Sequence, residues 1–264
     1  MKDFELQPGH IAAAFGVVIA VLLVIATVSE GPMNKVAAAP DFRQFEAGPE
    51  RKAAFFDYLL PIVESGNATL RKQRQRLEAI SEKAAPGSSD RRFVEQLAVD
   101  YKLDTTANDG GNVPLDSLTD ELLLRVDEVP PSLALAQAAK ESGWGTSRFA
   151  REGNNYFGQW CYKAGCGIVP ASRAPGRTHE VEAFDSPAES VASYMRNINT
   201  HSGYKSFREA RKVQRSEADA LSGVALAAEL SQYSERRDAY VAELRQLIVG
   251  NDLDRLDSDS PGDE

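Results

Sequence analysis

Residues 131–158 decide the fold, and they read PSLALAQAAKESGWGTSRFAREGNNYFG. A proline opens the stretch, where it suits the first turn of a helix, and apolar residues follow on almost every helical face. A helix that is apolar all round is buried within a larger fold. The stretch therefore predicts a buried helix that carries one acid, Glu141, at its end, directly before Gly143 and Gly145.

The position of Glu141 predicts an acid that holds its proton unusually well. Burial against apolar groups disfavours the charged carboxylate, and the negative end of a helix does the same, so both effects raise its pKa. A raised pKa is what a general acid needs near neutral pH. The two glycines leave room for an extended ligand, and Trp144 offers a flat surface for a sugar ring. The alternative is that these residues are purely structural. In that case the two glycines end the helix, Trp144 packs in the core and Glu141 is a solvated surface acid.

The composition excludes several classes of protein. The chain has 264 residues, of which 42% are hydrophobic and 26% charged, and this excludes collagen, a multi-span membrane protein and a wholly disordered chain. The net charge is −9, and more than half of this excess lies in residues 250–264. No stretch couples a basic face to a nucleic-acid motif, so nucleic acid is not an expected partner.

An uncharged apolar segment occupies residues 11–28. As a helix it would span about 27 Å, close to the roughly 30 Å hydrocarbon core of a bilayer. It is longer than the usual apolar part of a cleaved signal peptide, about 7–15 residues, and no basic region precedes it. We therefore expect one transmembrane helix at 11–28 that acts as an uncleaved anchor behind a short cytoplasmic segment, 1–10. A removed signal peptide and a buried core helix are the alternatives.

The rest of the chain divides by composition. Residues 29–48 are rich in Ala, Pro and Gly and predict a linker. Residues 49–128 form an N-terminal helical region, in which Pro61 is expected to kink or end the first helix. Glycines and prolines between 156 and 184 separate short apolar pieces, which indicates loops and a small antiparallel hairpin. The acidic tail, residues 250–264, is expected to be disordered.

The motif LAQAAKESGWG at 135–145, followed by NNYFG at 154–158, resembles the bacterial glucosaminidase family. That family's pattern is a helix end A-A-x-E-S-x-W-G and then N-N-[LY]-F-G. The resemblance implies a mainly α fold (α+β), a lysozyme-like helical lobe with a small β-hairpin, with the catalytic domain at 129–249. It also implies that the partner is the glycan strand of peptidoglycan, cut at β-1,4 bonds after N-acetylglucosamine without a cofactor. The shorter matches that support it are Trp160-Cys161, Gly165-Cys166-Gly167, 178–181, Ser190-Val191, 193–195, 199–201 and 233–236.

The resemblance also assigns roles to residues. Glu141 matches the family's general acid, and Tyr233 falls where the family has a tyrosine beside that acid. The residues expected at the substrate groove are Ser142, Trp144, Asn154, Asn155, Phe157 and Gly158. The alternatives are a turn that satisfies its own backbone for the two asparagines, and core packing for Phe157.

The identity of a second catalytic carboxylate is left open. Many glycosidases use two carboxylates, and here Glu180 and Glu182 alternate with Val181 along a predicted strand. Either acid could reach the cleft, or both could be solvated charges at the sheet edge. A third possibility is that the 2-acetamido group of the substrate acts as the nucleophile, so that Glu141 is the one essential acid.

Cys161 and Cys166 are five residues apart in a glycine-containing loop. Outside the cytoplasm they are expected to form a disulfide, and the alternative is two free thiols. A zinc site with His179 and His201 matches no usual ligand spacing, so no metal is expected. With the anchor and the wall-hydrolase resemblance, the pair predicts a single-pass inner-membrane protein with its catalytic domain in the periplasm. The competing functions are a lytic transglycosylase and a non-enzymatic, membrane-anchored wall-binding module.

Overall fold

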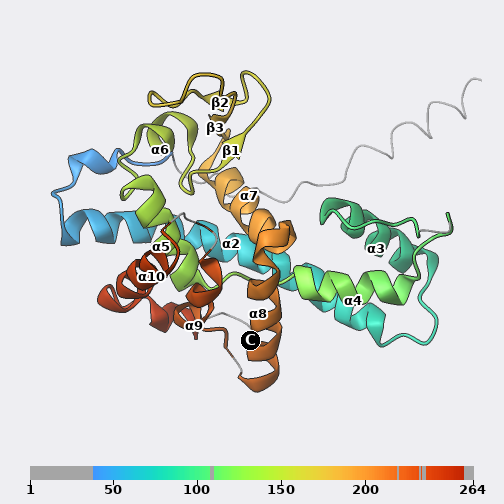
Figure 1. Ribbon diagram of the computed structural model, residues 1–264. Helices are drawn as coiled ribbons and strands as arrows, with labels where there is room; N and C mark the ends of the chain where they lie inside the picture. The colour runs from blue at the N-terminus through green and yellow to red at the C-terminus, as the bar shows by residue number, and fades with distance from the viewer. Residues whose placement is uncertain (1–37, 108–109, 219, 232, 234–235, 259–264) are drawn as a thin grey trace, which may run out of the picture. The chain divides into compact units, whose positions relative to one another are not determined.

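The computed structural model describes residues 38–258 except 108–109, 219, 232 and 234–235, and helices dominate it (Figure 1). Within this part of the chain no helix is long and apolar enough to cross a bilayer. The anchor predicted at 11–28 lies outside the described residues. The helices, in chain order, are η1 (Phe42–Gln44), α2 (Pro49–Ser81), α3 (Ser88–Asp100), α4 (Leu115–Arg125), α5 (Pro131–Ser142), α6 (Arg148–Gly153), α7 (Pro187–Thr200), η2 (Ser202–Tyr204), α8 (Lys205–Glu217), α9 (Gly223–Leu226), η3 (Ala227–Leu230), α10 (Asp238–Gly250) and η4 (Asp254–Asp257).

Three short strands form one antiparallel sheet in the described residues, so the predicted mainly helical fold with a small β element is confirmed. They are β1 (Trp160–Cys161), β2 (Gly167–Ile168) and β3 (Glu180–Glu182), in the order β1-β3-β2. Val181 pairs with Trp160 on one side and with Ile168 on the other. The predicted hairpin is therefore a three-stranded sheet. The predicted Cys161–Cys166 disulfide is present and ties the end of β1 to the start of β2.

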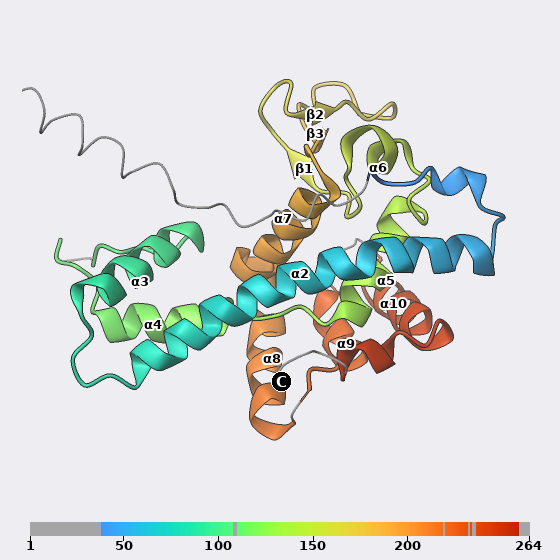
Figure 2. The same cartoon turned by 180° about the vertical axis from the view of Figure 1, so that it is seen from behind.

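Helix α5 lies at the centre of the fold, as its composition predicts. Every residue from Pro131 to Ala139 is buried, and the helix packs against α2, α9, α10 and η4 (Figure 2). Burying a side chain such as Leu133 or Leu135 contributes about 1.5–3 kcal/mol. The same burial leaves only the last turn of α5 near the surface, and that turn carries Glu141.

The start of α5 is capped by a residue from the far end of the chain. Asp257 accepts hydrogen bonds from the Ser132 backbone N–H (3.0 Å), the Ser132 hydroxyl (2.7 Å) and the Gly223 N–H (2.8 Å). Leu253 is buried beside it. The disorder expected after residue 250 is therefore wrong for residues 251–258, because this acidic segment supplies the cap that α5 lacks in its own sequence.

The predicted linker is also partly wrong, because residues 38–48 join the core. Phe42 is buried and packs edge-on against Phe55, with ring centroids 5.4 Å apart, and against Tyr58 at 5.9 Å. Helix α2 likewise runs through Pro61 without ending. Pro61 and Asp57, the residue whose carbonyl loses its partner, are both exposed, so water can satisfy that carbonyl.

A buried charge network holds the junction between α4 and α5. The Asp127 carboxylate accepts hydrogen bonds from Arg215, at 3.0 Å from Nε and 2.6 Å from Nη2. Arg211, only 1% exposed, donates to the carbonyls of Asp127 (3.1 Å) and Glu128 (2.8 Å). Burial alone would raise the pKa of Asp127, but the charges of Arg211 and Arg215 lower it overall. The network thus depends on an ionised Asp127.

We predict that Asp127→Asn lowers the free energy of unfolding by about 3–5 kcal/mol at pH 7, because it leaves Arg211 buried without its counter-charge. The folded-state pKa of Asp127 lies below its ordinary 3.8, so the stabilisation is present above about pH 4 and is lost at lower pH. Urea unfolding followed by circular dichroism at pH 7 and pH 3 checks both statements, and the difference from wild type should shrink at pH 3.

The matched control is Asp252→Asn, which removes the exposed pair with Arg255. Exposed pairs contribute about 0–1 kcal/mol, so this variant should unfold almost like the wild type. Equal losses in the two variants would contradict a special role for the buried network.

Candidate active site

Glu141 lies in the last turn of α5, which ends at Gly143 in a left-handed conformation (φ 57°). Partial burial raises the pKa of the Glu141 carboxyl group. A hydrogen bond from the Tyr240 hydroxyl and the charge of Lys140 oppose this shift, but burial prevails. The predicted direction of the pKa shift is therefore confirmed, and the group suits a proton donor.

Three tyrosines form a wall beside Glu141. The ring of Tyr233 stacks on Tyr240, with centroids 5.6 Å apart and planes at 6°, and lies 6.1 Å from Tyr204. Burial raises the pKa of Tyr204 to about 12 and those of Tyr233 and Tyr240 higher still, and the nearby charge of Glu141 adds to each. All three are therefore neutral at physiological pH. The structure thus brings Tyr233 next to the acid, as the resemblance implies.

Gly158 faces the acid from the opposite loop. Its φ of 67° is one that glycine adopts without strain, and a Cβ placed there would lie 3.8 Å from Oε2 of Glu141. The hydroxyl of Tyr233 donates to the carbonyl of Phe157, the preceding residue, at 3.0 Å. Gly158 is itself exposed, so a ligand can approach the carboxyl group along this backbone.

The two asparagines shape this loop from behind. Asn155 is buried: its Oδ1 accepts from the Phe157 N–H (3.2 Å) and the Gln159 N–H (3.1 Å), and its Nδ2 donates to the Gln159 and Glu182 carbonyls (2.9 Å each). Asn154 ends α6 at φ 49° and donates to the Phe184 carbonyl at 2.8 Å. These contacts hold the loop together and link it to β3. They agree with the alternative interpretation of the two asparagines, a turn that satisfies its own backbone.

Two other predicted groove residues are also buried. Ser142 has 0% of its surface exposed; its hydroxyl donates to the Ala138 carbonyl (2.6 Å) and accepts from the Gly145 N–H (2.8 Å). Phe157 stacks on Tyr194, with centroids 4.0 Å apart. Their side chains therefore hold the turn and the loop, and a direct substrate contact by either does not fit the structure.

The turn after α5 has an unusual backbone. Gly143, Trp144 and Gly145 have φ values of 57°, 59° and 73°. Gly145 lies so close to Phe42 that an added Cβ would be 2.3 Å from its ring. The glycine thus makes room for a core phenylalanine and not, as expected, for a ligand.

The ring of Trp144 packs mainly within the protein. It lies edge-on to Phe55 and Phe56, at centroid distances of 5.9 and 5.4 Å, and Lys52 Nζ sits 5.1 Å from its centroid. Its stacking on a sugar stays a prediction.

We predict that Gly145→Ala destabilises the fold by about 2–4 kcal/mol, since it combines an unfavourable positive φ with a clash against Phe42. Thermal unfolding measures the loss. Gly176→Ala is the control, because Gly176 also has a positive φ (81°) but nothing within 4 Å of an added Cβ. If both variants lose the same stability, the contact with Phe42 contributes nothing and our account of this glycine is wrong.

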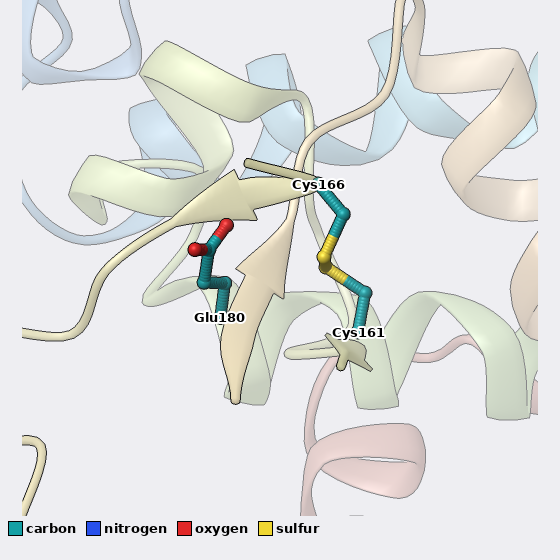
Figure 3. Close-up of side chains that lie close together, drawn as sticks. All are labelled: Cys161, Cys166 and Glu180. Atoms are coloured by element: carbon teal, nitrogen blue, oxygen red, sulfur yellow. A yellow bond between two sulfur atoms is a disulfide. The ribbon is translucent and has the colours of Figure 1, made fainter. Parts of the chain in front are cut away.

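Glu180 does not act as a free carboxylate. It is buried and accepts hydrogen bonds from the Gly165 N–H (3.1 Å) and the Gly167 N–H (2.9 Å), which lower its pKa. Figure 3 shows it next to the Cys161–Cys166 disulfide. Ligand-type atoms of these three residues lie within 4.8 Å of one another. The sulfurs are bonded to each other and both carboxylate oxygens are occupied, so the group serves to hold the loop.

Glu182 differs from Glu180. Burial raises its pKa, and its carboxylate has no hydrogen-bond partner among residues 38–258 as far as these are described. Its backbone N–H donates to the carbonyl of Gln159, the residue after Gly158, at 2.9 Å. Of the two acids predicted on β3, Glu182 is therefore the one whose backbone contacts the active-site loop and whose carboxyl group has no hydrogen-bond partner in the described residues.

A partly exposed aromatic pair follows the Asn155–Gln159 loop, and it was not identified from the sequence as part of the site. Trp160 on β1 is 56% exposed and stacks on His179, with centroids 4.3 Å apart. The sequence signal that could have indicated Trp160 is its position directly before Cys161, the first cysteine of the loop closed by the disulfide. Tyr240 was also missed as a site residue, because its position in an apolar helical pattern indicates only core packing.

The comparisons with known proteins agree with the motif. The chain belongs to the glucosaminidase family, whose model, described as mannosyl-glycoprotein endo-beta-N-acetylglucosaminidase, matches residues 121–253. It is similar to Protein bax of Escherichia coli (strain K12), with 34% identity over 206 residues that cover 78% of this chain and 72% of the relative. No solved structure matches it. Family membership places the chain among glycosidases that act on a glycan.

Proposed function

We propose that this protein is a peptidoglycan hydrolase that cleaves the β-1,4 bond after N-acetylglucosamine, with Glu141 as general acid. The observation that carries the proposal is the partly buried Glu141, with its raised pKa, at the exposed end of α5 and beside three neutral tyrosines. Glu141 gives its proton to the departing sugar oxygen. As that bond breaks, positive charge develops on the ring, and the ionised Glu141 left behind stabilises it.

Two mechanisms remain for the other side of the sugar. In one, Glu182 is the second carboxylate, supported by the contacts of its backbone with the Asn155–Gln159 loop and by a carboxyl group that has no hydrogen-bond partner within the described part of the chain. In the other, the oxygen of the 2-acetamido group, oriented by Tyr233, attacks the anomeric carbon as the glycosidic bond breaks, and water then opens the cyclic intermediate to complete the hydrolysis. Glu180 is left out of both, since two backbone N–H groups already occupy its oxygens.

We predict that Glu141→Gln lowers turnover on purified peptidoglycan by about 10²–10⁴-fold while binding persists, because the variant keeps the shape and loses the proton donor. Release of soluble fragments and co-sedimentation with peptidoglycan measure the two effects. Glu152→Gln, an exposed acid on α6, is the control and should match the wild type. A Glu141→Gln variant that digests as fast as the parent refutes the enzyme proposal.

The same assay separates the alternatives. A large loss in Glu182→Gln supports a second carboxylate, and little loss supports the acetamido route. Mass spectrometry of the fragments identifies the bond: reducing N-acetylglucosamine ends support hydrolysis at this bond, whereas anhydro-muramic ends support a lytic transglycosylase. A wild-type protein that binds every peptidoglycan tried and cuts none supports a wall-binding module.

We further propose that the domain works in the periplasm, tethered to the inner membrane by residues 11–28. The disulfide supports this location, because such bonds persist outside the reducing cytoplasm. A topology reporter fused after residue 264 should be active in its periplasmic form. A fusion that is active only in its cytoplasmic form overturns the proposal.

A further inference from the structure

We propose that Tyr240 is a positioning residue for the reaction, and that it forms the last link of a buried hydrogen-bond chain, Tyr194–Gln137–Tyr240, that ends on Glu141. The chain orients the carboxyl group and decides which of its two oxygens carries the acid proton. This inference rests on the proposed role of Glu141 as general acid, and it adds Tyr240, which lies outside the quoted motifs.

The chain joins three helices through the core. The Tyr194 hydroxyl, on α7, donates to Oε1 of Gln137 on α5 at 2.6 Å. Nε2 of Gln137 donates to the Tyr240 hydroxyl, on α10, at 3.0 Å. The Tyr240 hydroxyl accepts from Gln137 and is buried, so its one hydrogen needs an acceptor nearby. The carboxyl group of Glu141, one helical turn after Gln137, is the acceptor that we assign to it.

Burial makes this arrangement rigid. Gln137 is 0% exposed, and Tyr194 and Tyr240 are each 1% exposed. A polar side chain so deep in an apolar helix needs every hydrogen bond it can make, because water cannot replace a lost partner. Gln137 interrupts the run of alanines and leucines on α5 and has its two amide atoms satisfied by the two tyrosines. The simplest reason for a glutamine at this buried position is that it joins the two tyrosines in the hydrogen-bond chain.

The direction of each hydrogen bond follows from the chemistry of the groups. An ionised carboxylate only accepts, so Tyr240 must donate its one hydroxyl hydrogen to Glu141. The Tyr240 oxygen then accepts from the Gln137 amide nitrogen, which leaves the amide oxygen to accept from Tyr194. One assignment satisfies all the groups, and every donor in it points toward Glu141.

This direction has a consequence for the protonated acid. When Glu141 holds its proton, Tyr240 still donates to one carboxyl oxygen, and the proton must reside on the other. The chain thus prevents the acid from turning its proton toward the core. A carboxyl group held in one orientation with its proton outward is prepared for transfer to the leaving oxygen.

The test is Tyr240→Phe, which removes the hydroxyl and keeps the ring stacked on Tyr233. The Tyr240 hydrogen bond lowers the pKa of Glu141, so its loss should raise that pKa further. A general acid stops working above its pKa, so the alkaline limb of the pH–kcat profile should move to higher pH. We also expect kcat to fall by about 10–100-fold, since a misplaced catalytic group costs rate.

Carbon NMR titration of the Glu141 carboxyl group, assigned by its absence in Glu141→Gln, gives a readout that needs no substrate. An upward shift in Tyr240→Phe supports the chain even if the proposed function fails. An unchanged pKa and an unmoved pH limb overturn it, even if kcat falls. If Glu141→Gln loses activity and Tyr240→Phe has no effect, the proposed function is supported and the proposed role of the hydrogen-bond chain is refuted.

The matched control is Tyr101→Phe. The Tyr101 hydroxyl also donates to a glutamine, Gln73 Oε1 at 3.2 Å, but in the region of α2 and α3. The variant deletes the same kind of hydrogen bond at a position outside the Tyr194–Gln137–Tyr240 hydrogen-bond chain. It should therefore keep the pH profile and kcat of the parent. A fall in thermal stability of similar size in both variants, with a pKa shift in Tyr240→Phe alone, separates positioning from mere folding.

Discussion

Burial of α5 is the constraint on which the rest of the structure depends. The helix has no polar face to turn to water, so every neighbour must cover part of it. α2 covers it from the N-terminal region, α9 and α10 from the C-terminal region, and η4 covers its start. The acid at its end is therefore desolvated by the same packing that stabilises the fold, so the raised pKa of Glu141 and the stability of the fold depend on one element.

The loops around Glu141 are held by polar contacts within the protein. Asn155 holds the loop that brings Gly158 to the carboxyl group, and Glu180 holds the disulfide loop of the small sheet. Tyr233 joins the tyrosine wall to that loop through the carbonyl of Phe157. Because these groups are bonded within the protein, the exposed backbone of the loop at Gly158 is what faces Glu141.

Local pattern in the sequence was enough to predict the main features of α5 and of the acid at its end. The apolar periodicity of α5 predicts its burial, its end predicts the raised pKa of Glu141, and the spaced motif predicts the family. Contacts between distant residues could not be predicted in this way. The tail that contains Asp257 is acidic enough to indicate disorder, and the segment around Phe42 has a linker's composition, yet both pack on α5 or its turn. Tyr240 and Gln137 look like core positions until their partners are known.

The residues that pack on the two ends of α5 bear on how much of the chain is needed for the fold. The family match spans residues 121–253, but Phe42, which packs on the turn after α5, lies before it, and Asp257, which caps the start, lies after it. A fragment of residues 121–253 alone would lack Phe42 and Asp257, and it would also lack all of α2. The region of the family match therefore depends on residues on both sides of it, and we expect the flanking segments and this region to fold as one unit.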